Sequence, residues 1–204
     1  MADGRLDCQP ARNNCEPILG VLRKTRLPAA SPRRILEIAS GSGVHCCYLA
    51  TNLPDVLWQP TDYDPEALGS IDAWRATEGA ENLLPAKRLD VLDATWPERS
   101  YEAVVCINMV HAAPWAVTEA LMAVAARSLV TDGVLFMYGA YRDGGAYVGA
   151  GDQAFDDALR LRDPEWGLRD VLEVKEVAAN HGLVLEERVT MPKDNLSLIF
   201  RQAV

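Results

Sequence analysis

Two glycines that flank a serine lie directly after a short apolar run and form the clearest candidate for a ligand-binding turn. The surrounding segment reads EIASGSGVH over residues 37–45. Glycine has no Cβ atom, so Gly41 and Gly43 allow the backbone to approach a ligand and to adopt positive φ. A helix that begins after Gly43 would add unpaired backbone N–H groups to the same turn. A dinucleotide fingerprint would need a third glycine at position 46, and Cys46 there disfavours binding of NAD.

Polar side chains also close the strands that are expected after this turn. Asp62 lies 19 residues after Gly43, close to the spacing of about 20 at which an acidic residue binds ribose hydroxyls in dinucleotide sites. Asp90 closes the third expected strand, where it could face an adenine base, and Asn108 closes the fourth. Ligands of open α/β sheets bind beyond the carboxyl ends of the strands. These residues therefore predict one nucleoside site along a single edge of a sheet.

The elements that must position these residues follow from alternating apolar and amphipathic segments. Strands are predicted at residues 34–39, 56–59, 83–89, 101–107, 134–138, 183–189 and 196–200. Helices are predicted at residues 14–25, 44–51, from 65 onward, and at 114–130, 152–161 and 168–181, with a turn at 131–133. This alternation predicts a doubly wound, mostly parallel α/β sheet in a single domain that spans residues 1–204. The last two strands are adjacent in the sequence and favour an antiparallel edge pair.

The spacing E-x-x-x-G-x-G over residues 37–43 is typical of S-adenosylmethionine-dependent methyltransferases of the Rossmann-like class. The chain also resembles, more specifically, the methyltransferase-like 26 family. The resemblance rests on the segments EIASGSGVH (37–45), WQPTDYDPEAL (58–68), CINMVHAAPW (106–115), DPEWGLRD (163–170) and MPKDNLSLIFR (191–201). It begins at Arg12-Asn13 and continues nearly to the last residue. It implies a seven-stranded Rossmann-like class I methyltransferase sheet with an antiparallel last strand, and S-adenosyl-L-methionine as cofactor.

The turn, the strand ends and the resemblance together give a set of residues that are expected to contact the cofactor. The set is Arg12, Asn13, Glu37, Ala39, Gly41, Gly43, His45, Asp62, Tyr63, Asp90, Val91 and Asn108. Some of these residues have a structural alternative. Glu37 could orient the methionyl amino group or satisfy turn amides as a buried carboxylate, and Arg12 could pair with a cofactor carboxylate or remain solvated. Asp62 could cap the helix that begins at Pro65, although Asp64 is the better capping candidate.

A second set of residues is expected at the methyl acceptor. His111 follows Asn108 by three residues and is a candidate general base, because an imidazole with a pKa of about 6.5 can accept a proton at neutral pH. Its alternative role is a hydrogen-bonded pocket wall. The candidate acceptor-binding residues are His111, Trp115, Tyr138, Tyr141 and Asn195. The aromatic residues could equally be core, and Asn195 could be a turn residue.

Two segments outside the expected sheet are also assigned. Residues 1–30 are expected to form an N-terminal cap segment, and residues 139–165 a lid over the acceptor pocket. The lid begins with a glycine-rich stretch at 139–152. Within it Asp152 stands where the resembled family commonly has Asn.

Composition and charge restrict the partners. The formal net charge is −9 and the sequence pI is near 4.8, which disfavours nucleic acid and anionic membrane surfaces. No apolar run approaches the ~20 residues of a membrane span, and the polar N-terminus lacks a secretory signal. Five cysteines without a CxxC pair predict free thiols in a reducing cytoplasm, and three scattered histidines predict no metal site. The expected partner is a small-molecule substrate, with a homodimer as an open option.

These observations predict an enzyme that transfers a methyl group in line from S-adenosylmethionine to a small molecule. Two alternatives keep the same cofactor: non-methyl chemistry such as a cyclisation assisted by the sulfonium charge, and a non-catalytic binding module. A dehydrogenase is the weakest alternative, because of Cys46 and because no separate substrate domain is evident.

Overall fold

The computed structural model describes residues 4–78, 80–93 and 99–203. Its main sheet has seven strands in the order β3-β2-β1-β4-β5-β10-β9. The strands are β1 (Arg33–Ile38), β2 (Val56–Asp62), β3 (Lys87–Arg88), β4 (Tyr101–Ile107), β5 (Leu129–Gly139), β9 (Leu183–Thr190) and β10 (Leu196–Gln202). The first five pair in parallel, whereas β10 is antiparallel to both β5 and β9. The predicted doubly wound sheet with an antiparallel last strand is therefore confirmed.

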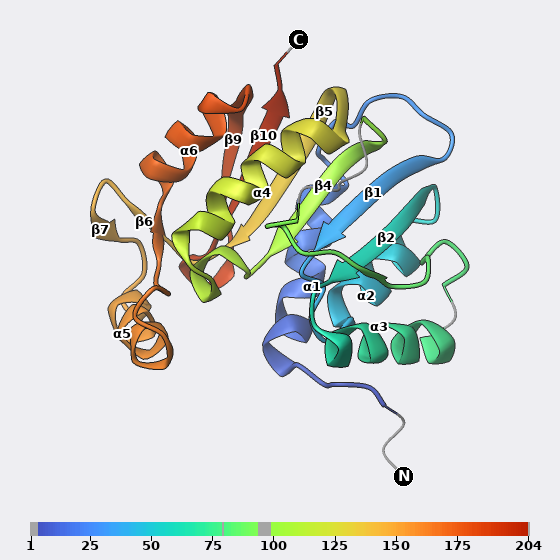
Figure 1. Ribbon diagram of the computed structural model, residues 1–204, viewed down its shortest axis with the longest axis horizontal. Helices are drawn as coiled ribbons and strands as arrows, with labels where there is room; N and C mark the ends of the chain where they lie inside the picture. Colours follow the sequence, from blue (N-terminus) through green and yellow to red (C-terminus); the bar gives the residue numbers. More distant parts are fainter. Residues whose placement is uncertain (1–3, 79, 94–98, 204) are drawn as a thin grey trace.

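Helices cover both faces of this sheet (Figure 1). They are α1 (Gln9–Leu22), α2 (Val44–Asn52), α3 (Pro65–Glu78), α4 (Trp115–Ser128), α5 (Asp152–Arg162) and α6 (Val171–Asn180), with short 3₁₀ helices η1 (Val110–Ala112) and η2 (Pro192–Asp194). Helices α1, α2 and α3 pack on one face, and α4 and α6 on the other. The central strands are buried on both faces, so β4 is apolar at almost every position.

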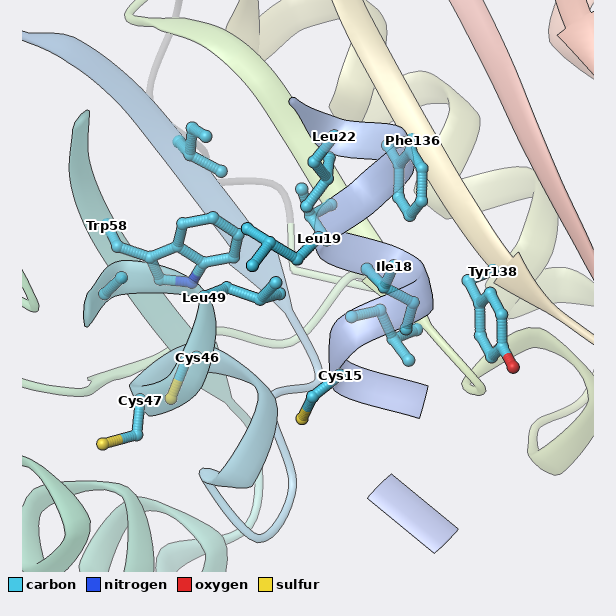
Figure 2. Close-up of a cluster of buried hydrophobic side chains, with 14 of the residues drawn as sticks. Cys15, Ile18, Leu19, Leu22, Cys46, Cys47, Leu49, Trp58, Phe136 and Tyr138 are labelled. Atoms are coloured by element: carbon cyan, nitrogen blue, oxygen red, sulfur yellow. The ribbon is translucent and has the colours of Figure 1, made fainter. Parts of the chain in front are cut away.

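Helix α1 contributes one apolar stripe to the first of these cores. Cys15, Ile18, Leu19 and Leu22 recur at helical spacing and are all buried. Figure 2 shows them beside side chains of the sheet, among them Trp58 and Phe136, and beside Leu49 of α2. The helix begins at Gln9 and not near residue 14 as predicted, because a proline in the first helical turn lacks only an N–H that would have no partner there.

Three further element boundaries differ from the predictions. Strand β5 begins at Leu129, so the predicted turn at 131–133 is an irregularity inside a strand: Asp132 has φ 64°, and the register with β4 shifts there. Strand β3 contains only two residues, and Leu83 contributes an isolated bridge to Trp58. The predicted helix 168–181 divides into strand β8 (Arg169–Asp170) and α6, because the Asp170 side chain caps the helix by accepting from the N–H of Leu172.

A small second sheet lies beside the main one. Strand β6 (Tyr141–Asp143) pairs with β7 (Ala146–Tyr147) and with β8, and α5 follows β7 in the chain. This arrangement brings the segment after β5 back toward the carboxyl ends of the main strands. In the described ranges no helix combines the length and apolar character that crossing a bilayer requires.

Candidate functional site

The turn after β1 contains the two glycines, and the structure explains the absence of a side chain differently at each position. Both have positive φ, 56° at Gly41 and 89° at Gly43. A Cβ atom at Gly43 would lie 2.9 Å from the Ile71 Cα of α3, so glycine is required there for helix packing. A Cβ at Gly41 would meet only the Ala39 carbonyl oxygen, at 4.0 Å. Gly41 thus faces open space, which is the geometry that a ligand against the backbone requires.

Cys46 occupies the position where a dinucleotide fingerprint would have glycine. Its Sγ donates a hydrogen bond to the Gly43 carbonyl oxygen at 3.1 Å, and the side chain is fully buried. Burial raises the pKa of this thiol well above its ordinary value. Cys46 is therefore an unreactive packing residue behind the turn (Figure 2).

Asp62, at the carboxyl end of β2, binds the same turn. One carboxylate oxygen accepts from the N–H of Gly41 at 2.9 Å, and the other accepts from the N–H of Asp64 at 3.0 Å. A carboxylate has about four acceptor positions, so each oxygen can accept one more hydrogen bond. The cap of α3 belongs to Asp64, which accepts from the N–H of Glu66 at 2.9 Å. Asp62 can therefore hold the turn and bind two ligand hydroxyls at once.

Glu37 is a buried carboxylate beneath this turn. It is 1% exposed, and its Oε2 accepts from the Trp58 indole N–H at 2.8 Å. Burial raises its pKa to about 7; hydrogen bonds from Trp58 and Ser40 oppose that shift, and the charge of Asp62 adds to it. Glu37 lines neither of the two cavities described below. Its observed partner is an indole, so the structure gives it a role in the packing of β1 against β2.

A cavity of about 300 Å³, the smaller cavity, opens at the carboxyl ends of β1, β2 and β4. Four residues predicted to contact the cofactor line it: Ala39, Tyr63, Asp90 and Val91. The remaining walls are mostly apolar and come from Ile38, Leu89, Leu92, Met109, Ala112, Ala113, Pro114, Val117 and Trp166. Apolar walls with one carboxylate suit a flat base that has an exocyclic amino group. The Asp90 Oδ1 also accepts from the N–H of Leu92, at 2.9 Å.

Two left-handed residues lie at neighbouring strand ends of this edge. Ala39 follows β1 with φ 55°, and Asn108 follows β4 with φ 56°. Non-glycine residues rarely adopt this conformation, and such strain concentrates at binding sites. The Asn108 N–H donates to the Tyr138 carbonyl oxygen at 2.8 Å, which fixes the bend.

A second cavity of about 550 Å³, the larger cavity, adjoins the first. The two share Ala112 and Trp166. Asn108, His111 and Asn195, all predicted site residues, line the larger cavity. Its other lining residues are Cys8, Pro10, Asn14, Ala140, Asp152, Phe155, Leu159, Arg162 and Lys193. The walls therefore come from the start of α1, from the segment after β5 and from η2.

His111 is buried in the wall of the larger cavity, at 5% exposure. Its Nδ1 has no hydrogen-bond partner among the residues that the structure describes. Burial, together with the positive charge of Arg169, lowers its pKa to about 4, so the imidazole is neutral and able to accept a proton near pH 7. The ring meets Phe155 edge to face, with centroids 5.4 Å apart. Gly139 lies beside it, where a Cβ atom would be 3.3 Å from Nδ1.

The loop that carries His111 is held from the segment 163–170. The Arg169 guanidinium donates to the carbonyl oxygens of Val110, at 2.9 Å, and of Ala113. The N–H of Gly167 donates to the His111 carbonyl oxygen at 3.0 Å. The Arg169 guanidinium also lies 5.7 Å from the centre of the Trp115 ring. A residue about 60 positions away in sequence thus fixes the loop between the two cavities.

The N-terminal segment packs against α3. The Arg12 guanidinium pairs with Asp7 at 2.8 Å and lies 5.2 Å from the Trp74 ring centre. Leu6 donates its N–H to the Ser70 hydroxyl, which in turn donates to the Ser42 carbonyl oxygen of the glycine turn at 2.6 Å. Arg12 lines a separate cavity of about 310 Å³ between α1 and α2. Residues 1–3 of the expected N-terminal cap lie outside the described residues.

Several predicted site residues do not reach the walls of the smaller or larger cavity. They are Arg12, Asn13, Glu37, Gly41, Gly43, His45, Asp62, Trp115, Tyr138 and Tyr141. Tyr138 is buried on the α1 face and Tyr141 on the α4 and α6 face, so both are core residues. His45 is buried in the first turn of α2, which lowers its pKa to about 4, and its Nε2 has no partner in the described part of the chain. Asn13 accepts from the Gln9 side chain on α1.

The sequence interpretation of the site missed two residues that line these cavities and one, Arg169, that holds the loop between them. Phe155, Trp166 and Arg169 lie on segments that the strand-end argument did not consider. The motif DPEWGLRD, residues 163–170, contains two of them and was an available signal. A further cavity, of about 480 Å³, lies between the end of α1 and the loop before β2, at the amino ends of the strands. Open α/β sheets bind ligands at the opposite edge.

The strand order and the cavities at the carboxyl ends define a class I methyltransferase fold. Residues 7–202 match the family described as "Protein of unknown function (DUF938)", and the chain belongs to this family. Demethylmenaquinone methyltransferase from Deinococcus radiodurans is 35% identical over 95 residues, which are 43% of this chain and 38% of that protein.

Solved structures show the same fold at low sequence identity. An O-methyltransferase family 2 protein from Planctomyces limnophilus, in complex with apigenin, has a TM-score of 0.80 at 18% identity. The match covers 95% of this chain and 58% of that one. The S-adenosylmethionine-dependent methyltransferase SibL has a TM-score of 0.79 at 16% identity, over 95% of this chain and 56% of that one. The chain thus spans little more than half the length of these neighbours.

Proposed function

We propose that the protein transfers a methyl group from S-adenosylmethionine to a small molecule. The observation that carries the proposal is the pair of adjoining cavities at the carboxyl ends of the strands, which share Ala112 and Trp166. One has the apolar walls and the carboxylate that an adenosine requires. The other, at about 550 Å³, falls in the size range of small-molecule sites. The methyltransferase names of the similar proteins and the motifs shared with the methyltransferase-like 26 family support the same assignment.

The residues around the smaller cavity fit the cofactor. Asp90 lines this cavity and can accept from the adenine amino group. Asp62 lines neither cavity but directly precedes Tyr63 of the lining, and it retains acceptor positions for two ribose hydroxyls. Gly41 faces open space, so a ligand can lie against its backbone. The bound sulfonium would supply the methyl group, and its positive charge activates that group for nucleophilic attack. The protein then has to orient the acceptor, and orientation alone can lower a barrier by about 7–11 kcal/mol.

His111 is the candidate proton acceptor. It is neutral because burial lowers its pKa to about 4, and its Nδ1 has no partner in the described part of the chain. General-base catalysis typically contributes about 10²–10⁴-fold, and it is most efficient when the pKa of the base lies near the working pH. A base with a pKa of about 4 is weak, so the contribution of His111 should be small. Acceptors with an acidic hydroxyl or thiol need the least help. The proton would pass from the acceptor to the imidazole and then to solvent.

The test separates the cofactor from the acceptor. Calorimetry with S-adenosylhomocysteine and with NADH should detect the first ligand alone; a preference for NADH would defeat the proposal. The protein is then incubated with methyl-labelled S-adenosylmethionine and a cell extract divided by ultrafiltration. Label should enter the low-molecular-weight fraction, and His111→Ala should reduce its transfer without weakening binding of S-adenosylhomocysteine. Label found in protein or RNA would contradict a small-molecule acceptor, and binding without any transfer would favour a non-catalytic module.

A further inference from the structure

Two positively charged side chains line the larger cavity without an ionic partner. Arg162 ends α5, and Lys193 lies in η2. Neither forms an ion pair with another described residue. Other cations of the same region are paired: Arg160 with Asp156 at 3.2 Å, and Arg188 with the carboxylate of Asp143 at 2.6 Å. The two charges that face the cavity are therefore available to a ligand.

Two acidic groups lie near this wall. Asp152 is the carboxylate that lines the larger cavity, and its Oδ2 accepts from the N–H of Gly149 at 2.8 Å. Asp194 packs against the same glycine, because a Cβ atom there would lie 2.8 Å from its Oδ2. With His111 neutral, the described lining has two cations and one carboxylate. This local excess of positive charge occurs in a chain whose net charge is −9.

Part of the wall of the larger cavity is apolar and aromatic. Phe155, Leu159 and Trp166 all line the larger cavity. Phe155 is 41% exposed, which leaves a large part of its ring open, and its edge contact to His111 is 5.4 Å between centroids. An aromatic side chain in this position can stack on or meet the edge of a planar ligand ring.

We infer that the acceptor is an aromatic carboxylic acid, whose carboxylate binds Arg162 and Lys193 while its ring packs on Phe155 and a ring hydroxyl faces His111. This inference rests on the proposed function, because the larger cavity is the acceptor site only if the smaller one binds the cofactor. Arg162 and Lys193 then act in substrate selection and have no part in proton transfer. Charge-assisted hydrogen bonds are about twice as strong as neutral ones, so the acid should be preferred over a neutral molecule of the same shape.

The experiment compares matched acids and amides on protein that is saturated with S-adenosylhomocysteine. The probes are 4-hydroxybenzoate, 4-hydroxyphenylacetate and 4-hydroxycinnamate, each beside its primary amide, and affinity is measured by ligand-observed NMR titration. At least one acid should bind about tenfold more tightly than its amide. Arg162→Gln and Lys193→Gln should each reduce that acid's affinity about fivefold to tenfold and leave the amide unchanged. Lys175→Gln, at an exposed position on α6 that lines neither cavity, is the matched control.

The outcomes distinguish this inference from the proposed function. If S-adenosylhomocysteine binds and no acid exceeds its amide, including the case in which no probe binds, the inference is overturned and the proposed function stands. The inference is also overturned if Lys175→Gln loses as much acid affinity as the two cavity variants. It is overturned as well if the cavity variants lose S-adenosylhomocysteine affinity to the same extent as acid affinity. Absence of S-adenosylhomocysteine binding to the unaltered protein refutes the proposed function and the inference together.

Discussion

Asp62→Asn is the substitution that most directly tests the proposed cofactor site. The wild-type carboxylate accepts from two backbone donors, Gly41 at 2.9 Å and Asp64 at 3.0 Å, through different oxygens. Asparagine has one acceptor oxygen and one amide NH₂ group. In either orientation of the asparagine side chain, its NH₂ group would face one of the two backbone N–H donors, which would then have no acceptor. The free acceptor positions that a ribose would use are reduced at the same time, and the negative charge is lost.

Two energies follow from this geometry. The unpaired turn N–H should lower the free energy of unfolding by about 1–3 kcal/mol. Loss of charge-assisted hydrogen bonds to the ribose should cost about 1.5–3 kcal/mol of binding. Since 1.4 kcal/mol corresponds to a factor of ten, affinity for S-adenosylhomocysteine should fall about 10- to 150-fold. The binding loss is expected in protein that remains folded.

Calorimetric titration with S-adenosylhomocysteine gives the affinity, and thermal unfolding of the same samples gives the folded fraction. Asp64→Asn is the matched control, because Asp64 lies in the same loop and accepts from the N–H of Glu66 at the start of α3. Asparagine caps a helix about as well as aspartate, so this variant should keep both its Tm and its affinity.

A folded Asp62→Asn protein whose affinity stays within twofold of wild type would refute the ribose assignment. The carboxylate would then serve only to hold the turn. An equal loss of affinity in Asp64→Asn would also count against the assignment, since it would attribute the effect to the loop as a whole.

Three further predictions concern the glycines and the buried carboxyl. Gly43→Ala should lower the free energy of unfolding by about 2–5 kcal/mol, because of backbone strain and a clash with α3. Gly41→Ala should lower it by only about 1–2 kcal/mol and should mainly weaken binding of S-adenosylhomocysteine. Denaturant unfolding measures the stability of both variants, and calorimetry measures their affinity. The pKa of Glu37 is raised from 4.5 to about 7, so folding favours its protonated form. As pH rises from 4.5 to 7, the free energy of unfolding of the wild type should therefore fall by on the order of 3 kcal/mol relative to that of Glu37→Gln. Gly139→Ala places a Cβ 3.3 Å from the His111 ring and should reduce kcat about tenfold through misplacement of the imidazole, with cofactor affinity unchanged.

Each of these predictions has a contrary result. Equal Tm losses in the two glycine variants would contradict their different roles. The comparison with Glu37→Gln is needed because His45 and His111 act in the opposite direction: burial lowers the pKa of each to about 4, so their contribution is present above about pH 6.5 and lost as pH falls toward 4. Parallel stability curves for wild type and Glu37→Gln across this range would show that Glu37 is not protonated on folding. An unchanged kcat in Gly139→Ala would exclude a close fit at His111.

The parts of the fold that were predicted correctly are those with strong local signals. Strand β4 coincides with the prediction residue for residue, because a seven-residue apolar run between polar ends has few alternatives. Helix α3 begins at Pro65 as predicted, since proline suits a first helical turn. The cap of α3 by Asp64 also followed from its position just before that proline.

The acceptor side depended on contacts that no local pattern encodes. Arg169 holds carbonyl groups 56 and 59 positions earlier in the chain, and sequence periodicity carries no information about such a contact. Tyr138 was assigned to the acceptor pocket as an aromatic wall residue, yet its side chain is buried in the core that contains α1 (Figure 2). A register shift by an odd number of residues moves a side chain to the other face of a strand, and β5 has a register irregularity relative to β4 between Leu129 and Val134.

The larger cavity takes much of its wall from one uninterrupted stretch of chain, between β5 and α6. That stretch begins at Ala140 and rejoins the strand-end loop at Gly167 and Arg169, whereas residues at the strand ends form most of the smaller cavity. Chimaeras that exchange residues 141–165 between relatives should therefore alter which compound is accepted, while the lining of the smaller cavity, Trp166 included, stays intact. The two junctions, Ala140 and Trp166, would be the positions to retain in such a design.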